Sequence, residues 1–322
     1  MNEELMMRLG ELNRAEPPRH APAASPARAA TGPVVEQSGI NDDELSQLPP
    51  GEVIENSWGR HWLSERPMAR IWPGGGEWLD QQLTRIRHAA PCAASGRAAS
   101  GRAASGRAAS GRAADEWNAL IDALPEQAVF LDLETCGFAG SMVFLVGLIL
   151  QRDGQLVLLQ LLARHYGEEK AMLQTLWQQL SGKRVLATFN GKCFDWPMVH
   201  DRSTLHHLGR PSHHAAEDDN RPATGTGQQE ILGRHDPRPR LVHCDLLHHA
   251  RRRWGGKLPD CRLQTLERYV LRRRRSSDIP GRDIPAVYHD FVRTSDAWLI
   301  RAVLHHNALD LVTLLQLSVC VG

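Results

Sequence analysis

Two acidic side chains interrupt a long apolar stretch near the middle of the 322-residue chain. Asp132 and Glu134 lie within residues 128–150, whose sequence is AVFLDLETCGFAGSMVFLVGLIL. If this stretch is a β-strand, alternation puts both carboxylates on one face, about 6 to 7 Å apart. Buried carboxylates need a nearby cation, because an unpaired buried charge is costly. The pattern indicates a Mg²⁺ or Mn²⁺ site rather than a zinc site, although two solvated acids at an exposed strand end would give the same sequence.

A third acid follows a later predicted strand, residues 185–189. Asp195 comes after the turn Asn190-Gly191-Lys192, and open α/β sheets place their sites beyond the carboxyl ends of strands. An aspartate at this place also caps a helix, where it accepts hydrogen bonds from free N–H groups. Asn190 has the same ambiguity, as a turn residue or as an amide that orients a ligand.

A fourth acid lies on a predicted amphipathic helix, residues 296–317. His306, Asn307 and Asp310 share one face of this helix, at spacings of three and four residues. A single histidine on such a face is usually a core residue with a polar partner. The aspartate one turn later favours a functional site instead.

Together these segments supply four carboxylates and a histidine. Such a set suits two divalent ions and phosphodiester hydrolysis, in which one ion generates hydroxide and the other stabilises the leaving oxygen. A neutral imidazole beside the ions can deprotonate water, because its pKa lies near neutrality.

Basic residues gather in the C-terminal third of the chain. Residues 241–293 hold twelve Lys and Arg against six Asp and Glu. Arg251, Arg252 and Arg253, and the run at 272–275, are placed to follow a phosphate backbone. Solvated helix ends are the alternative interpretation of both runs.

Composition excludes several classes of protein. The net charge of +1 gives no basic footprint over the whole chain. The six cysteines are scattered without CxxC spacing, which argues against a disulfide framework or a zinc site. The acidic start MNEELMMRLG is unlike a secretory signal, and no apolar run reaches the length of a bilayer. We therefore expect a cytoplasmic protein without a membrane partner.

The segments differ enough in composition to predict separate parts. The AASGR repeat matches neither a helix nor a strand period, and its glycines weaken a helix. In the folded part, predicted strands alternate with helices after a hairpin around Asp153-Gly154, which indicates a mixed α/β sheet. The predicted parts are a disordered, low-complexity N-terminal region (1–50), a small β ribbon with a connection (51–90), a flexible AASGR linker (91–114) and a domain (115–322) with a loop insertion at about 203–240.

Three segments, FLDLET, FNGKCFD and HHNALD, resemble the exonuclease motifs of the DEDD superfamily. More narrowly, the chain resembles the YprB-type ribonuclease H-like domain in the sequence and the order of five segments. These segments are FLDLETCGFAGSMVFLVGL, FDWPMVHDR, HCDLLHHARRRW, DIPGRDIPAVY and HNALD. The resemblance covers about 129–317, and GEVIENSWGRHWL resembles the lead-in ribbon of that family. It implies a ribonuclease H-like mixed sheet flanked by helices.

The resemblance also implies a 3'-to-5' exonuclease that uses two Mg²⁺ or Mn²⁺ ions on single-stranded ends of DNA or RNA. The metal ligands that it implies are Asp132, Glu134, Asp195 and Asp310.

The general base that the resemblance implies is His306 by motif or His305 by spacing, five residues before the last acid. Only one can face the same water, because neighbouring helix residues point about 100° apart. The predicted substrate contacts are Asn190, Lys192, Arg251, Arg252 and Arg253.

Two other functions fit the same residues. The first is a nucleic-acid-binding module that has the fold and hydrolyses nothing. The second is a metal-dependent phosphoesterase that acts on a small nucleotide. The sequence names no protein partner.

Overall fold

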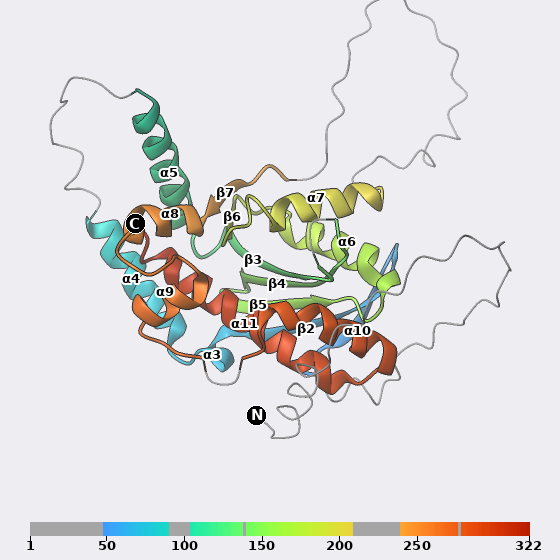
Figure 1. Cartoon of the computed structure of the whole chain (residues 1–322). Coiled ribbons are helices and arrows are strands. Elements are labelled where there is room, and N and C mark those ends of the chain that lie inside the picture. Colours follow the sequence, from blue (N-terminus) through green and yellow to red (C-terminus); the bar gives the residue numbers. More distant parts are fainter. Residues whose placement is uncertain (1–47, 90–103, 138–139, 209–238, 276–277) are drawn as a thin grey trace, which may run out of the picture.

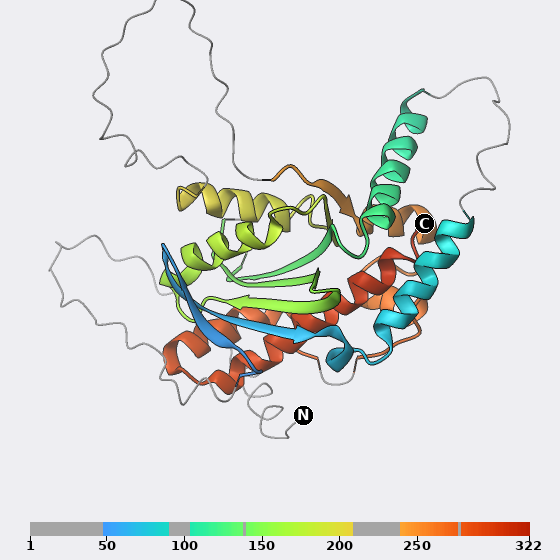
Figure 2. The same ribbon diagram turned by 180° about the vertical axis from the view of Figure 1, so that it is seen from behind.

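A mixed seven-stranded sheet with helices on both faces forms the protein (Figures 1 and 2). This computed structural model describes residues 48–89, 104–137, 140–208, 239–275 and 278–322. The strands lie in the order β1-β2-β5-β4-β3-β6-β7. Their bounds are β1 (Glu52–Asn56), β2 (Gly59–Pro67), β3 (Ala128–Thr135), β4 (Val143–Arg152), β5 (Gln155–Leu162), β6 (Val185–Thr188) and β7 (Val242–Asp245). The predicted fold class is confirmed.

The α-helices are α3 (Met68–Ile71), α4 (Gly75–Ala89), α5 (Ala104–Ala123), α6 (Glu169–Leu180), α7 (Asp195–Leu205), α8 (Leu246–Trp254), α9 (Leu263–Tyr269), α10 (Ile284–Thr294) and α11 (Ala297–Ser318). Among the described residues, none of these helices is long and apolar enough to cross a membrane.

The sheet combines an antiparallel and a parallel half. Strands β1, β2, β5, β4 and β3 pair antiparallel, whereas β3, β6 and β7 pair parallel. The β4–β5 hairpin turns at Asp153 and Gly154 with φ of 50° and 77°, as the Asp-Gly pair predicts.

The predicted β ribbon consists of β1 and β2, which form a hairpin at the edge of the main sheet. Strand β2 pairs with β5 from Trp62 opposite Leu162 to Pro67 opposite Val157. Strand β2 takes this place because the edge of β5 would otherwise carry unpaired N–H and C=O groups, which β2 satisfies.

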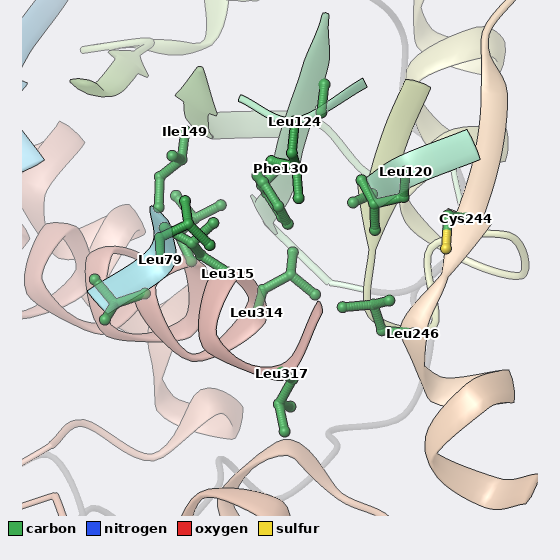
Figure 3. Close-up of a cluster of buried hydrophobic side chains, with 14 of the residues drawn as sticks. Leu79, Leu120, Leu124, Phe130, Ile149, Cys244, Leu246, Leu314, Leu315 and Leu317 are labelled. Atoms are coloured by element: carbon green, nitrogen blue, oxygen red, sulfur yellow. The ribbon is translucent and has the colours of Figure 1, made fainter. Parts of the chain in front are cut away.

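Alternation along β3 divides its side chains between two cores. Val129, Leu131 and Leu133 pack towards α6 and α7. Ala128 and Phe130 face the opposite way and pack with side chains of α11, as Figure 3 shows for Phe130, Leu314, Leu315 and Leu317. Asp132 and Glu134 continue this second set, so alternation directs both carboxylates to the side of α11.

Helix α5 begins inside the AASGR repeat, at Ala104, and not near residue 115. Alanine and arginine are strong helix formers, and a helix nucleated by DEWNALIDA extends backwards at little further cost. The flexible linker expected over 91–114 is therefore corrected from residue 104 onwards. Residues 1–47, 90–103 and 209–238, which carry the predicted disordered region, the rest of the repeat and most of the loop insertion, lie outside the described residues.

Candidate metal centre

Strand β3 supplies two carboxylates that repel each other. Burial raises the pKa of Asp132 well above its ordinary value, and the charges of Asp310 and Glu134 raise it further. Burial also raises the pKa of Glu134 to about 8; His306 opposes this rise, and Asp310 adds to it. Both groups therefore retain protons at pH values where a solvated carboxyl group is ionised.

Asp195 joins these acids from the first turn of α7. It is buried, and burial raises its pKa to about 7, although backbone N–H groups that include that of Leu133 hold the pKa down. Strand β6 pairs with β3 only up to Phe130, so the residues of β3 after Phe130 have no β6 partner. The start of α7 lies next to this unpaired part of β3, which brings Asp195 beside the strand.

The turn that leads to Asp195 is held by a residue that we did not predict, Asp245 at the end of β7. Its carboxylate accepts hydrogen bonds from the backbone N–H groups of Asn190 at 2.8 Å and Lys192 at 3.0 Å. It also caps α8 through Leu247. Asn190 adopts a φ of 67°, which asparagine tolerates better than most residues. The sequence could have indicated the role of Asp245, because this aspartate lies between a predicted strand and a predicted helix.

Helix α11 contributes Asp310 and His306. Burial raises the pKa of Asp310, while the nearby charges of Arg275 and His306 oppose the rise. His306 is buried, with Nδ1 2.9 Å from Oδ1 of Asp278 and Nε2 3.5 Å from Oδ2 of Asp310. Burial lowers its pKa, but these carboxylates outweigh burial and raise it to about 9. His305 is exposed on the same helix, and which of the two is the general base stays a prediction.

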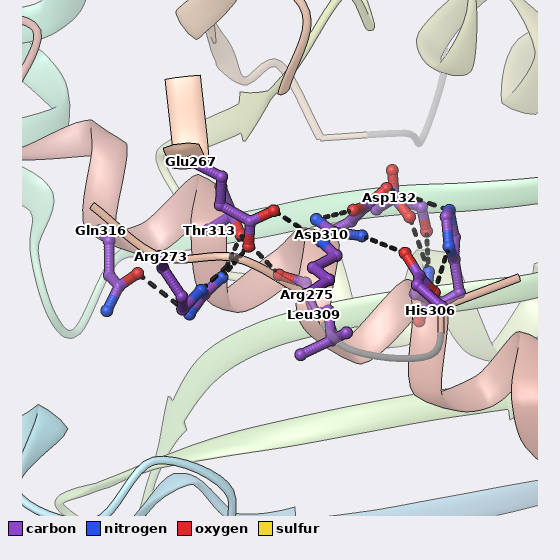
Figure 4. A network of polar contacts seen from close by, with 11 residues as sticks. Asp132, Glu267, Arg273, Arg275, His306, Leu309, Asp310, Thr313 and Gln316 are labelled. Carbon is purple, nitrogen blue, oxygen red and sulfur yellow. Dashed lines mark hydrogen bonds and ion pairs between the residues drawn. The ribbon is translucent and has the colours of Figure 1, made fainter. Parts of the chain in front are cut away.

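Arg275 is the main cation at this site, and Figure 4 shows it between the acids. Its side chain is 6% exposed and forms ion pairs with Glu267, Asp278 and Asp310. Burial would lower its pKa, but the charges of Asp310 and Glu267 hold the pKa above its ordinary value. Arg273, two residues earlier, also forms an ion pair with Glu267. Both arginines therefore form ion pairs with acids inside the protein, whereas the sequence predicted that they would contact phosphate groups of a substrate.

The donor chemistry fits hard divalent cations. Four carboxylates supply only oxygen ligands, which suit Mg²⁺ or Mn²⁺. Across the described ranges, no three His, Cys, Asp or Glu side chains already form a set of metal ligands. Asp132 accepts a hydrogen bond from Asn307 through Oδ2, and Asp310 is paired with Arg275. A cation would therefore bind Asp132 beside the hydrogen bond from Asn307 and would compete with Arg275 for Asp310.

A cavity of about 490 Å³ opens beside the acids. Of the predicted substrate contacts, Asn190 and Arg251 line it, together with Asp132 and Asp310. Sequence reasoning missed the other side chains in its wall, which are Phe189, Leu247, Asp260, Cys261, Arg262 and Leu263.

The other predicted contacts lie elsewhere. Lys192 forms an ion pair with Glu116 at 2.7 Å. Arg253 donates a hydrogen bond to the backbone oxygen of Gly322. Arg252 is exposed on α8. Their contacts with substrate stay predictions.

The fold and its acids define an α/β protein of the ribonuclease H-like class. The chain belongs to the RNase H superfamily, because the model of that family matches residues 129–321. It is therefore a nuclease-type domain, and the predicted family is confirmed. A protein of Bacillus subtilis (strain 168) named "Uncharacterized protein YprB" is 33% identical over 193 residues. This similarity covers 59% of the present chain and 40% of that relative.

We expect divalent cations to raise the unfolding temperature more at about pH 8 than at about pH 5.5. Without metal, the raised pKa values of Glu134 and Asp195 mean that the folded state keeps protons that the unfolded chain releases above about pH 4. Stability without metal then falls as pH rises towards 8, and the raised pKa of His306 acts in the same direction up to about 9. Cations compete with these protons and bind best at high pH.

The measurement is thermal unfolding with Mg²⁺, Mn²⁺ or chelator at both pH values, with ionic strength matched by sodium chloride. An equal shift at the two pH values would contradict the idea that these acids bind the cation.

Proposed function

We propose that this domain is a metal-dependent nuclease that removes nucleotides from single-stranded 3' ends with two Mg²⁺ or Mn²⁺ ions. The observation that carries the proposal is a set of four buried carboxylates whose raised pKa values reflect burial and one another's charge, two of which, Asp132 and Asp310, line a cavity. Such a set is stable in its ionised form only with added positive charge. The four acids are Asp132, Glu134, Asp195 and Asp310.

In this proposal the protein side chains bind the cations and the substrate. When bound, the ions lower the pKa of an attacking water and stabilise charge on the leaving oxygen. His306 or His305 accepts the proton of that water. His306 does so only if the added positive charge lowers its pKa from about 9, since an imidazolium has no free lone pair.

The cavity favours a single nucleotide as the bound unit. Its volume of about 490 Å³ lies within the range of pockets that hold a small molecule. Arg251 and Arg262 in its wall are suited to phosphate, because guanidinium groups bind phosphate oxygens in pairs. Phe189 gives the same cavity an apolar surface for a base. A site that accepts one terminal nucleotide suits an exonuclease better than a nuclease that cuts within a strand.

The test is a time course on single-stranded DNA and RNA, labelled at the 5' end in one series and at the 3' end in another. We expect a stepwise ladder from the 5'-labelled strand and early release of a labelled mononucleotide from the 3'-labelled strand. A chelator should stop both, and circular single strands should survive. Cleavage of circular strands would exclude an exonuclease, and the two sugars compared side by side identify the preferred substrate.

A non-catalytic binding module is the second candidate. The observation in its favour is that Arg275 and Asn307 already engage Asp310 and Asp132. Strand binding that does not change with Mg²⁺ or chelator, together with no product from any end, would support this module over the nuclease.

We also propose a cytoplasmic location for the protein, on the basis of its sequence.

A further inference from the structure

A row of residues crosses four strands of the sheet and ends at Asp132. Asp132 on β3 lies opposite Gly147 on β4, Gly147 lies opposite Gln160 on β5, and Gln160 lies opposite Ser64 on β2. Side chains in one row of a sheet point to the same face. Gly147 therefore leaves a gap in this row, next to the acid.

Asn307 of α11 fills that gap. A Cβ atom on residue 147 would lie only 2.1 Å from Oδ1 of Asn307 and 2.6 Å from Cδ1 of Leu311. No side chain larger than hydrogen fits there unless α11 or Asn307 moves. Asn307 is fully buried, as is Gln160, so their polar groups depend on protein partners.

A chain of hydrogen bonds runs along this row in one direction. Arg66 Nη2 donates to Gln160 Oε1 at 2.7 Å, and Gln160 Nε2 donates to Asn307 Oδ1 at 2.9 Å. Asn307 Nδ2 then donates to Asp132 Oδ2 at 2.8 Å. An arginine only donates, so Gln160 presents its oxygen to Arg66 and its nitrogen to Asn307, and the nitrogen of Asn307 is left to face Asp132.

We propose that Asn307 is a positioning residue for Asp132, held in place by Gln160 and by the missing side chain at Gly147. Its hydrogen bond to Oδ2 fixes the rotation of the Asp132 carboxylate before a cation binds. The inference rests on the proposed function, because positioning matters only if Asp132 is a metal ligand. Outer partners of this kind typically change metal affinity by about 10- to 100-fold.

The closing experiment measures Mn²⁺ affinity directly, from the loss of the electron paramagnetic resonance signal of free Mn²⁺ on titration with protein. Gly147→Ala is the main variant, because it moves Asn307 without removing a polar group. We expect it to weaken Mn²⁺ binding about tenfold or more. Asn307→Ala should have a similar effect, and Gly147→Ala added to it should change affinity little further, since only the contact with the flexible end of Leu311 then remains.

Ser64→Ala is the matched control. Ser64 stands in the same row, but its hydroxyl donates to the backbone oxygen of Pro50 at 2.6 Å. This variant should bind Mn²⁺ as the unmodified protein does. If Gly147→Ala does not fold, Gln160→Met replaces it, because this near-isosteric change removes the hydrogen bond to Asn307 together with the one to the backbone oxygen of Leu304, and Gln160 itself does not contact the Asp132 carboxylate through a hydrogen bond.

The outcomes separate the two proposals. Unchanged Mn²⁺ affinity in a folded Gly147→Ala or Gln160→Met protein would overturn the role of Asn307 and leave the nuclease proposal intact. Independent, additive losses from Gly147→Ala and Asn307→Ala would also overturn it. No Mn²⁺ binding by the unmodified protein would overturn the proposed function and this inference with it.

Discussion

Replacing Asp132 with Asn should abolish hydrolysis and leave the fold intact. Asparagine keeps the shape of the side chain and an oxygen that can still accept the hydrogen bond from Asn307, but it removes the negative charge that a cation needs. We expect the rate to fall by at least about a thousandfold, which corresponds to about 4 kcal/mol. The measurement is single-turnover hydrolysis of a labelled single strand in Mg²⁺ and in Mn²⁺.

The stability of the Asp132→Asn protein without metal tests whether the variant keeps its fold. Burial and the neighbouring carboxylates raise the pKa of Asp132, so its charged form is unfavourable in the protein without metal. Asp132→Asn should therefore unfold in chelator at the same temperature as the unmodified protein or at a higher one.

The matched control is Asp122→Asn, which neutralises an exposed acid on α5. It should leave both hydrolysis and stability unchanged. Hydrolysis above a tenth of the normal rate in a folded Asp132→Asn protein would remove Asp132 from the metal site.

The parts of the site that sequence predicts depend on local periodicity. Alternation along β3 places Asp132 and Glu134 on one face, because each side chain direction follows from the strand alone. Helical spacing likewise places His306 and Asp310 one turn apart on α11. These local rules need no knowledge of what packs against the strand or the helix.

The partners of these residues depend on tertiary structure and were missed for that reason. Gly147 and Gln160 matter only in the observed register, since a shift of one residue would turn both to the other face. Arg275 belongs to a run of four arginines, and nothing local distinguishes an arginine that points inward from one that is exposed. The sequence predicts the β ribbon but not its partner strand, because pairing between β2 and β5 joins segments about 100 residues apart.

Replacing Glu267 with Gln should destabilise the protein more than any surface change. Glu267 on α9 is 1% exposed. Its Oε1 accepts hydrogen bonds from Arg273 at 3.0 Å and Thr313 at 2.7 Å, and its Oε2 accepts one from Arg275 at 2.6 Å. Breaking a buried ion pair by removing one partner costs about 3 to 5 kcal/mol, because the other charge stays buried without compensation.

We therefore expect Glu267→Gln to lower the free energy of unfolding by about 3 kcal/mol and the unfolding temperature by about 10 °C. The measurement is denaturant and thermal unfolding in chelator. Asp290→Asn breaks the exposed pair with Arg293 and should cost less than about 1 kcal/mol. Equal small losses in both variants would show that the Glu267 network adds no stability. A large loss for Glu267 alone would show that its buried ion pairs with Arg273 and Arg275 stabilise the fold.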